Sequence, residues 1–303
     1  MSMPHFRRSI RDRRDGRGNA VQRAVAAFKY VVQSALSPRS HGAWLDFVYA
    51  TPLLSAALAY DPRLIDRAQH HYINRHLPRT ARYAILTDHY RSLLTMLPHD
   101  VSEGIYLRGR YRVGTLRLKG GEALLIELRR PTGRGREGEL SLCLADGSGE
   151  LLSSMIFSIA DAGTTLLVGC VQGAAMGLGR EAVRDLTKQC HGLRPKNLLV
   201  SLLRAFAARY GISRIRGVAN AAHPFAGKAN KIKADYDSFW LECSSVLDAE
   251  GFHELPALEP ERDEALVASK HRSAFRQREA LRREACASLL AALDQRSDLA
   301  QVG

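Results

Sequence analysis

The stretch YRVGTLRLKGGEALLIELRR, residues 111–130, sets the pattern that decides the fold. Two apolar runs, Tyr111–Leu118 and Ala123–Arg130, flank Gly120-Gly121, which is typical of two strands joined by a tight turn. Three runs of the same kind follow, separated by the turn sequences Gly133–Gly138 and Asp146-Gly147: Glu139–Leu144, Leu151–Ile159 and Thr165–Val171. Five successive strands with short loops predict an antiparallel meander between Ile105 and Gly173.

Helical spacing returns on both sides of the meander. Before it, Val21, Val25, Phe28 and Val32 recur in steps of four, three and four residues. After it, the pattern predicts these elements in order: helices Arg180–Cys190 and Pro195–Tyr210, strand Ser213–Val218, helix Ile232–Cys243, strand Phe252–Leu255 and a long helix Glu259–Asp294. The fold class is therefore α+β, a mostly antiparallel mixed sheet of six or seven strands with helices on its faces.

This pattern divides the chain into three parts. Residues 1–18 carry charge and glycine without an apolar period, so we expect a disordered basic arm whose deletion leaves stability unchanged. Residues 19–100 form a helical N-terminal region, and residues 101–303 form the α+β domain with its C-terminal helix.

The composition of the 303 residues is that of a globular protein, with 46% hydrophobic and 25% charged residues. Lys and Arg number 44 against 31 Asp and Glu, a net charge of +13, which favours a partner that is anionic: nucleic acid, a phosphate-bearing molecule or a membrane surface. Five cysteines without a CxxC pair argue against a zinc ribbon or a thioredoxin-type site and favour reduced thiols.

About half of the positive excess lies at the N-terminus, where residues 1–40 hold nine Lys/Arg and two Asp. The arm is either a solvated tail or a tether to anionic lipid or nucleic acid. No uninterrupted apolar segment follows it, and the charge-free run Phe47–Tyr60 is too short to span a bilayer. We therefore expect a cytoplasmic protein, soluble or peripheral at the inner membrane.

Two glycine-bearing turns are candidates for binding phosphate, because strand ends and helix N-termini present free backbone N–H groups. They supply the expected cofactor-binding residues Gln172, Gly173, Gly177, Gly179, His191, Arg194 and Lys196. Pro195 fits the first turn of a helix, so the cations beside it would lie at a helix start. Neither turn has the Gly-Lys-Ser/Thr of a Walker loop or a complete dinucleotide fingerprint.

A second group of polar residues follows the strand that ends near Val218. The expected catalytic residues are His223, Tyr236, Asp235, Asp237 and Asn220, with His223 as general base and Tyr236 as general acid. The competing interpretation is structural: the aspartates cap a helix, and the aromatic rings pack. We expect no metal, because HxH and HExxH spacings are absent, and no serine hydrolase, because there is no Gly-x-Ser-x-Gly elbow.

Four motifs in this region resemble those of the bacterial VirK/YbjX family, and the likeness covers roughly residues 60–290. They read HGLRPK (191–196), VANAAH (218–223), KADYDSFW (233–240) and KHRS (270–273). The family has long been labelled as of unknown function. Some of its members are linked with virulence and with resistance to cationic antimicrobial peptides in Gram-negative bacteria, so the resemblance implies a bacterial envelope context.

The order of elements also resembles the acyl-CoA N-acyltransferase (GNAT) plan. In that family a Gln/Arg-x-x-Gly-x-Gly/Ala turn binds the CoA pyrophosphate, and here the turn has both glycines, Gly177 and Gly179, but Ala174 in the first place. The resemblance implies an acyltransferase that uses acyl-CoA or another acyl thioester as donor. The charged turn His191–Lys196 would then hold the phosphates.

Three functions remain open. The first is acyl transfer to an amine of a small molecule, peptide or protein. The second is a non-catalytic envelope-associated or regulatory protein that binds an anionic partner at the inner membrane surface. A nucleic-acid binder is a third, for which only the charge argues. In the first case we expect the His191–Lys196 turn and the segment Asn220–Asp237 to face one cavity.

Overall fold

The computed structural model describes residues 3–13, 19–131, 135–173, 179–227, 234–260 and 262–294. Its centre is an eight-stranded sheet in the order β1-β2-β3-β4-β5-β6-β8-β7. Every neighbouring pair is antiparallel except β5 and β6. The strands are β1 (Arg110–Arg117), β2 (Ala123–Arg129), β3 (Leu140–Asp146), β4 (Leu151–Ala160), β5 (Thr165–Gln172), β6 (Arg214–Val218), β7 (Val246–Leu247) and β8 (Phe252–Leu255). The expected α+β class is confirmed.

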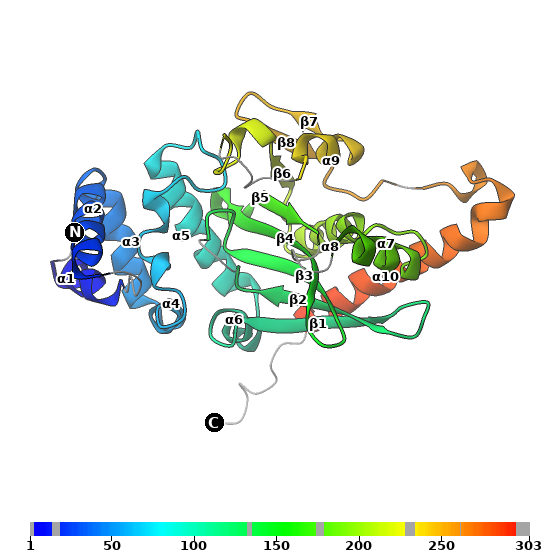
Figure 1. Ribbon diagram of the computed structural model, residues 1–303, viewed down its shortest axis with the longest axis horizontal. Helices are drawn as coiled ribbons and strands as arrows, with labels where there is room; N and C mark the ends of the chain where they lie inside the picture. Colours follow the sequence, from blue (N-terminus) through cyan, green and yellow to red (C-terminus); the bar gives the residue numbers. More distant parts are fainter. Residues whose placement is uncertain are drawn as a thin grey trace.

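Helices cover both faces of the sheet (Figure 1). Phe157 of β4 packs against Phe206 of α8 with ring centroids 5.7 Å apart, whereas its neighbour Ser158 is hydrogen-bonded to Tyr72 from the N-terminal region. Successive strand residues point to opposite faces, so these contacts place α8 and the N-terminal region on opposite sides. The helices are α1 (Met3–Asp12), α2 (Ala20–Ala35), α3 (Pro38–Ala50), α4 (Pro52–Ala57), α5 (Arg79–Met96), α6 (His99–Tyr106), α7 (Gly179–Gln189), α8 (Pro195–Arg209), α9 (Tyr236–Glu242) and α10 (Arg272–Asp294).

The first residues differ from the expected disordered arm, because Met3–Asp12 forms helix α1 and packs on the helical region. The Ser9 hydroxyl is buried and lies 2.5 Å from that of Tyr30, and Nε of Arg13 donates to Asp66 over 2.7 Å. Phe6 stacks on the same tyrosine. Phe6 and Ser9 are three residues apart and so share one helix face. The many charged residues around them make this face difficult to recognise in the sequence. Residues 14–18 of the expected arm lie outside the described residues.

The apolar stripe of α2 faces away from the protein. Val21 and Phe28 are each 69% exposed, and Val25 and Val32 are 47% and 40% exposed. The buried side of the helix instead carries Tyr30, whose hydroxyl lies 2.9 Å from Nε2 of His41. The spacing therefore predicts the helix correctly but not the face that packs.

The last helix begins at Arg272 rather than near Glu259. Glu259 precedes Pro260, and the residue before a proline is disfavoured in the α conformation. Short 3₁₀ turns at Glu264–Leu266 and Ser269–His271 follow. The carboxylate of Glu259 accepts hydrogen bonds from Arg204 of α8 and Arg282 of α10, which fixes this connection against both helices.

Candidate functional site

The parallel strands β5 and β6 pair for four residues and then part. Their ladder runs from Thr165–Arg214 to Val168–Gly217, while β5 continues to Gln172. At the same point the β4–β5 register shifts and leaves Gly169 as an extra residue in β5. A Cβ atom on Gly169 would lie 2.1 Å from the carbonyl oxygen of Glu137, so the chain at residue 137 crosses the bulge where only glycine fits.

Tyr236 and His223 lie together at this divergence. Their rings are stacked with centroids 5.3 Å apart, and both side chains are buried. The Tyr236 hydroxyl donates a hydrogen bond to Sγ of Cys170 over 3.3 Å, and Nε2 of His223 lies 3.2 Å from a carboxylate oxygen of Glu137. Burial raises the pKa of Tyr236 and that of Cys170, so both are protonated at neutral pH. Nδ1 of His223 accepts a hydrogen bond from the backbone N–H of Phe225 over 3.2 Å, so both ring nitrogens face a polar group.

Asn220, Asp235 and Asp237, expected as catalytic residues, form a hydrogen-bonded frame beside this pair. The Asn220 side chain donates to Asp235 over 2.8 Å and accepts from the backbone N–H of Tyr236 over 2.9 Å. Asp235 also caps α9 by accepting from the N–H of Ser238, and Asp237 accepts from the N–H of Asn220. Hydrogen bonding to Asn220 lowers the pKa of Asp235. In the structure these three residues position Tyr236.

The charged turn before α8 contacts α9. Arg194 stands at the start of α8, and its guanidinium is bonded to the carboxylate of Glu242 in α9. The ammonium of Lys196 lies 5.3 Å from the ring centroid of Phe239, also in α9, and burial lowers its pKa. His191 adopts a left-handed backbone (φ 54°) in the turn after α7. The turn therefore adjoins the helix that carries Tyr236, but the charge of Arg194 already has a partner.

The other expected phosphate turn is described only at its two ends. The carbonyl of Gln172 accepts a hydrogen bond from the Ser153 hydroxyl over 2.8 Å, so this residue closes β5 against β4, and Gly173 follows it. Gly179 begins α7. Gly177 lies outside the described residues, and the role of this turn in binding phosphate stays a prediction.

Sequence reasoning missed Glu137 and Cys170. Glu137 lies in a glycine-rich connection that is typical of a simple turn, and its contact with His223 joins positions 86 residues apart. Cys170 follows Gly169, and a glycine within an apolar strand is the local signal of a bulge. The contact of the Cys170 thiol with Tyr236 is seen only in the assembled sheet, where the register shifts beside it.

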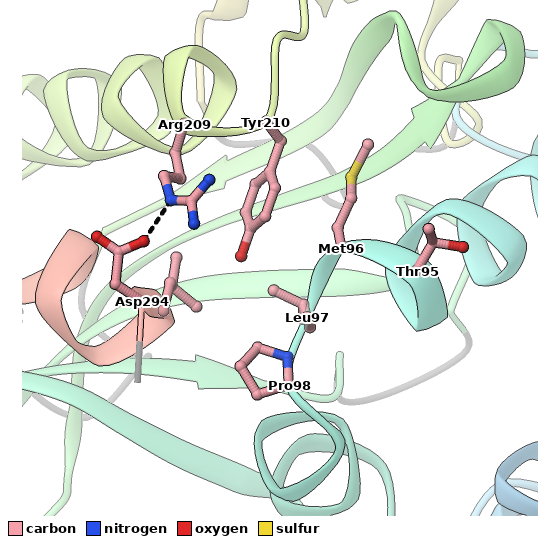
Figure 2. A pocket seen from close by; sticks show the side chains of 8 residues that line it. Thr95, Met96, Leu97, Pro98, Arg209, Tyr210 and Asp294 are labelled. Carbon is pink, nitrogen blue, oxygen red and sulfur yellow. Dashed lines mark hydrogen bonds and ion pairs between the residues drawn. The ribbon is translucent and has the colours of Figure 1, made fainter. Parts of the chain in front are cut away.

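A separate cavity of about 550 Å³ lies at the far end of α8 (Figure 2). The ends of α5, α8 and α10 line it, and Arg209 donates to Asp294 across its rim over 2.5 Å. Burial raises the pKa of Tyr210 in this cavity to about 12. Since Lys196 and Tyr210 stand at opposite ends of α8, this cavity is not part of the Tyr236 cluster.

Among the residues that the structure describes, no three His, Cys, Asp or Glu side chains are grouped to hold a metal ion. Within the same residues, no helix has the length and apolar character needed to cross a membrane.

The fold and the site define an α+β protein in which a parallel strand pair parts around a buried Tyr–His–Cys cluster. The chain belongs to the family described as Protein of unknown function (DUF535), whose model matches residues 19–289. It is 29% identical over 258 residues to the uncharacterized protein YbjX of Escherichia coli, covering 82% of this chain and 78% of that protein. The resemblance seen in the four sequence motifs is thereby confirmed.

More distant relatives match shorter segments. An uncharacterized protein of Haemophilus influenzae is 32% identical over 131 residues, which is 42% of this chain and 43% of that protein. A membrane protein named LapB from Mannheimia haemolytica is 40% identical over 53 residues, 18% of this chain and 24% of that protein. Among solved structures, a cAMP-binding acyltransferase from Mycobacterium smegmatis matches with a TM-score of 0.30 and 11% identity, over 73% of this chain and 64% of that one.

Proposed function

We propose that the protein is an acyltransferase that moves an acyl group from an acyl thioester to an amine at the divergence of β5 and β6. The observation that carries this proposal is the proton-transfer pair, His223 and Tyr236, placed where the parallel ladder ends after Val168 and Gly217. The carboxyl ends of parallel strands are a common place for ligand binding.

Each member of the cluster has a role in the proposed reaction. The amine nitrogen attacks the thioester carbon, the new C–N bond forms and the C–S bond breaks. Nδ1 of His223 takes the proton that the amine loses, after releasing its hydrogen bond from the N–H of Phe225, and the carboxylate of Glu137 beside Nε2 stabilises the resulting imidazolium. Tyr236 hydrogen-bonds the leaving sulfur, as it does Cys170 in the structure, and then protonates it. Proton transfer from His223 back to Tyr236 restores both groups.

The frame of Asn220, Asp235 and Asp237 supports this proposal by fixing the start of α9 and hence the Tyr236 hydroxyl. Lys196 is the remaining cation of the charged turn without a bonded carboxylate among the described residues, so we assign it, rather than Arg194, to the donor's phosphates. Replacement of Arg194 should then disturb the contact with Glu242 more than ligand affinity.

The first test is a thermal-shift screen of the whole chain with CoA and several acyl-CoAs, followed by an assay of thiol release with amine acceptors. A ligand at one hundred times its Kd adds about 2.7 kcal/mol of stability, which gives a clear shift. Tyr236→Phe should lower kcat with little change in KM, because its hydroxyl acts on the leaving group. Tyr210→Phe is the matched control, since it also removes a buried hydroxyl, remote from the cluster. No thermal shift and no thiol release, or full activity in Tyr236→Phe, would contradict the proposal.

The second candidate is a non-catalytic protein that binds an anionic partner at the inner membrane surface. It is favoured because polar groups of the candidate site are bonded to other residues of the protein, Arg194 to Glu242 and Asn220 to Asp235. In that case the Tyr236 cluster serves packing alone, and Tyr236→Phe changes stability without changing any binding activity.

A further inference from the structure

The outward face of α2 is a continuous apolar stripe of Val21, Val25, Phe28 and Val32, and Leu36, just after the helix, extends it with 62% of its surface exposed. At 3.6 residues per turn these positions fall within about a quarter of the helix circumference. Tyr30, which anchors the helix to the protein, lies about half a turn away. The stripe therefore points directly away from the body of the protein. Contiguous exposed apolar surface of this kind marks an interaction site.

The charges around the stripe are of one sign. Lys29 of α2 borders the stripe, whereas Arg23 lies on the opposite side of the helix, and α2 has no acidic residue. Its neighbour α1 adds the exposed Arg7 and Arg11, with Asp12 as its one acid. Residues 1–40 together hold nine basic and two acidic side chains. The stripe thus lies in a part of the chain that is rich in positive charge.

The position of the stripe suits an extended partner. Helices α1 and α2 lie at one end of the long axis of the molecule, with the sheet between them and the start of α10 (Figure 1). The candidate site at β5 and β6 lies in the central part of the molecule, so contact at α2 leaves it uncovered.

We infer that α2 is an interfacial helix that binds the surface of an anionic lipid bilayer. An apolar face bordered by cations is the pattern of helices that lie in the plane of a membrane. With 16 residues and two cations, α2 is suited to lie on a bilayer and not to cross it. A second copy of this chain is a poorer occupant, because a two-fold interface would bring the same positive surfaces together. This inference is independent of the proposed acyl transfer.

The test is co-sedimentation of the full chain with vesicles of phosphatidylethanolamine and phosphatidylglycerol, compared with phosphatidylcholine vesicles. Val21→Ser/Phe28→Ser should weaken binding to the anionic vesicles by about tenfold or more, because two apolar side chains no longer enter the bilayer. Leu258→Ser/Leu266→Ser is the matched control, since these leucines are 78% and 87% exposed and lie far along the chain. It should bind as the native protein does. Circular dichroism confirms that each variant is folded.

A second readout reports depth in the membrane. The tryptophan emission of Phe28→Trp should shift to the blue on anionic vesicles, whereas that of Leu266→Trp should not. Three results would overturn the inference: native protein that binds neither vesicle, equal loss in the control variant, or sedimentation showing a dimer that Val21→Ser/Phe28→Ser converts to monomer. The last result would assign the stripe to self-association.

Discussion

Replacing Arg67 by Met should be strongly destabilising, because it removes one side of a buried ion pair. Arg67 is 4% exposed, and its guanidinium is bonded to the carboxylates of Asp61 and Glu139. Glu139 is fully buried before β3 and accepts a hydrogen bond from the Tyr90 hydroxyl over 2.5 Å. Methionine fills a similar volume but leaves the Glu139 carboxylate without its counter-charge. The contact joins the helical region to the sheet, so its loss weakens the attachment of the two parts.

Removing one partner of a buried pair costs about 3–5 kcal/mol. Urea unfolding followed by circular dichroism measures this loss as a lower midpoint. Burial raises the pKa of Glu139 even with Arg67 present, and without Arg67 it rises further. The folded variant then binds a proton at a pH where the unfolded chain has released it, so stability falls as pH rises. The loss should therefore be larger at about pH 8 than at about pH 5.

The double variant Arg67→Met/Glu139→Gln tests the cause. Glutamine still accepts from Tyr90 but carries no charge, so it should recover about half or more of the lost stability. A cost below about 1 kcal/mol for Arg67→Met, or a deeper loss when Glu139→Gln is added, would refute this role of the buried pair.

Three further outcomes follow from the packing. Deleting residues 1–13 should lower stability by about 2 kcal/mol in thermal or urea unfolding, opposite to the expectation from charge alone, and an unchanged midpoint would show that α1 contributes nothing. Gly217→Ala places a Cβ 2.3 Å from the ring of Trp240 and should cost about 1–3 kcal/mol, whereas the control Gly147→Ala meets its nearest atom at 3.9 Å and should be tolerated. Burial and the charge of Arg67 lower the pKa of His89 to about 3, so the unfolded chain takes up a proton first as pH falls below about 6.5. Native stability should then decline toward pH 3, and a pH profile of His89→Gln as steep as the native one would contradict this assignment.

The strands were predictable to within about two residues because their signals are local. Alternating apolar residues and glycine-bearing turns mark β1 to β5, and Phe252–Leu255 is found where expected. The two-residue edge strand Val246–Leu247 was missed, since both side chains are exposed and no alternation distinguishes them. The order of the helices was also predictable, but the buried face of α2 was not, because periodicity identifies an apolar side without saying what covers it.

The candidate site was predictable in part, because only some of its contacts have a local signal in the sequence. Asn220, Asp235 and Tyr236 come together because one short strand end and one helix start meet, and both are marked in the sequence. Glu137 and Cys170 reach the cluster through a crossing connection and a bulge, which are properties of the assembled sheet. The number of polar residues in the motif did not distinguish those that hold the helix start from those that could transfer protons. Asp and Asn at a helix start cap the helix whether or not a reaction occurs nearby.

The positions of the α2 stripe and the Tyr236 cluster decide whether the protein could bind a membrane and an acyl acceptor at the same time. The apolar stripe of α2 lies at one end of the molecule, and the Tyr236 cluster lies at the divergence of β5 and β6 in its centre. A protein held at a bilayer by α2 would keep this divergence free of lipid, so an acceptor amine would have to reach it from solution or on a long flexible group. Buried contacts such as Arg67–Glu139 and Tyr72–Ser158 fix the helical region against the sheet. The membrane face and the candidate site are thus parts of one packed structure, and orientation at the bilayer would orient the site as well.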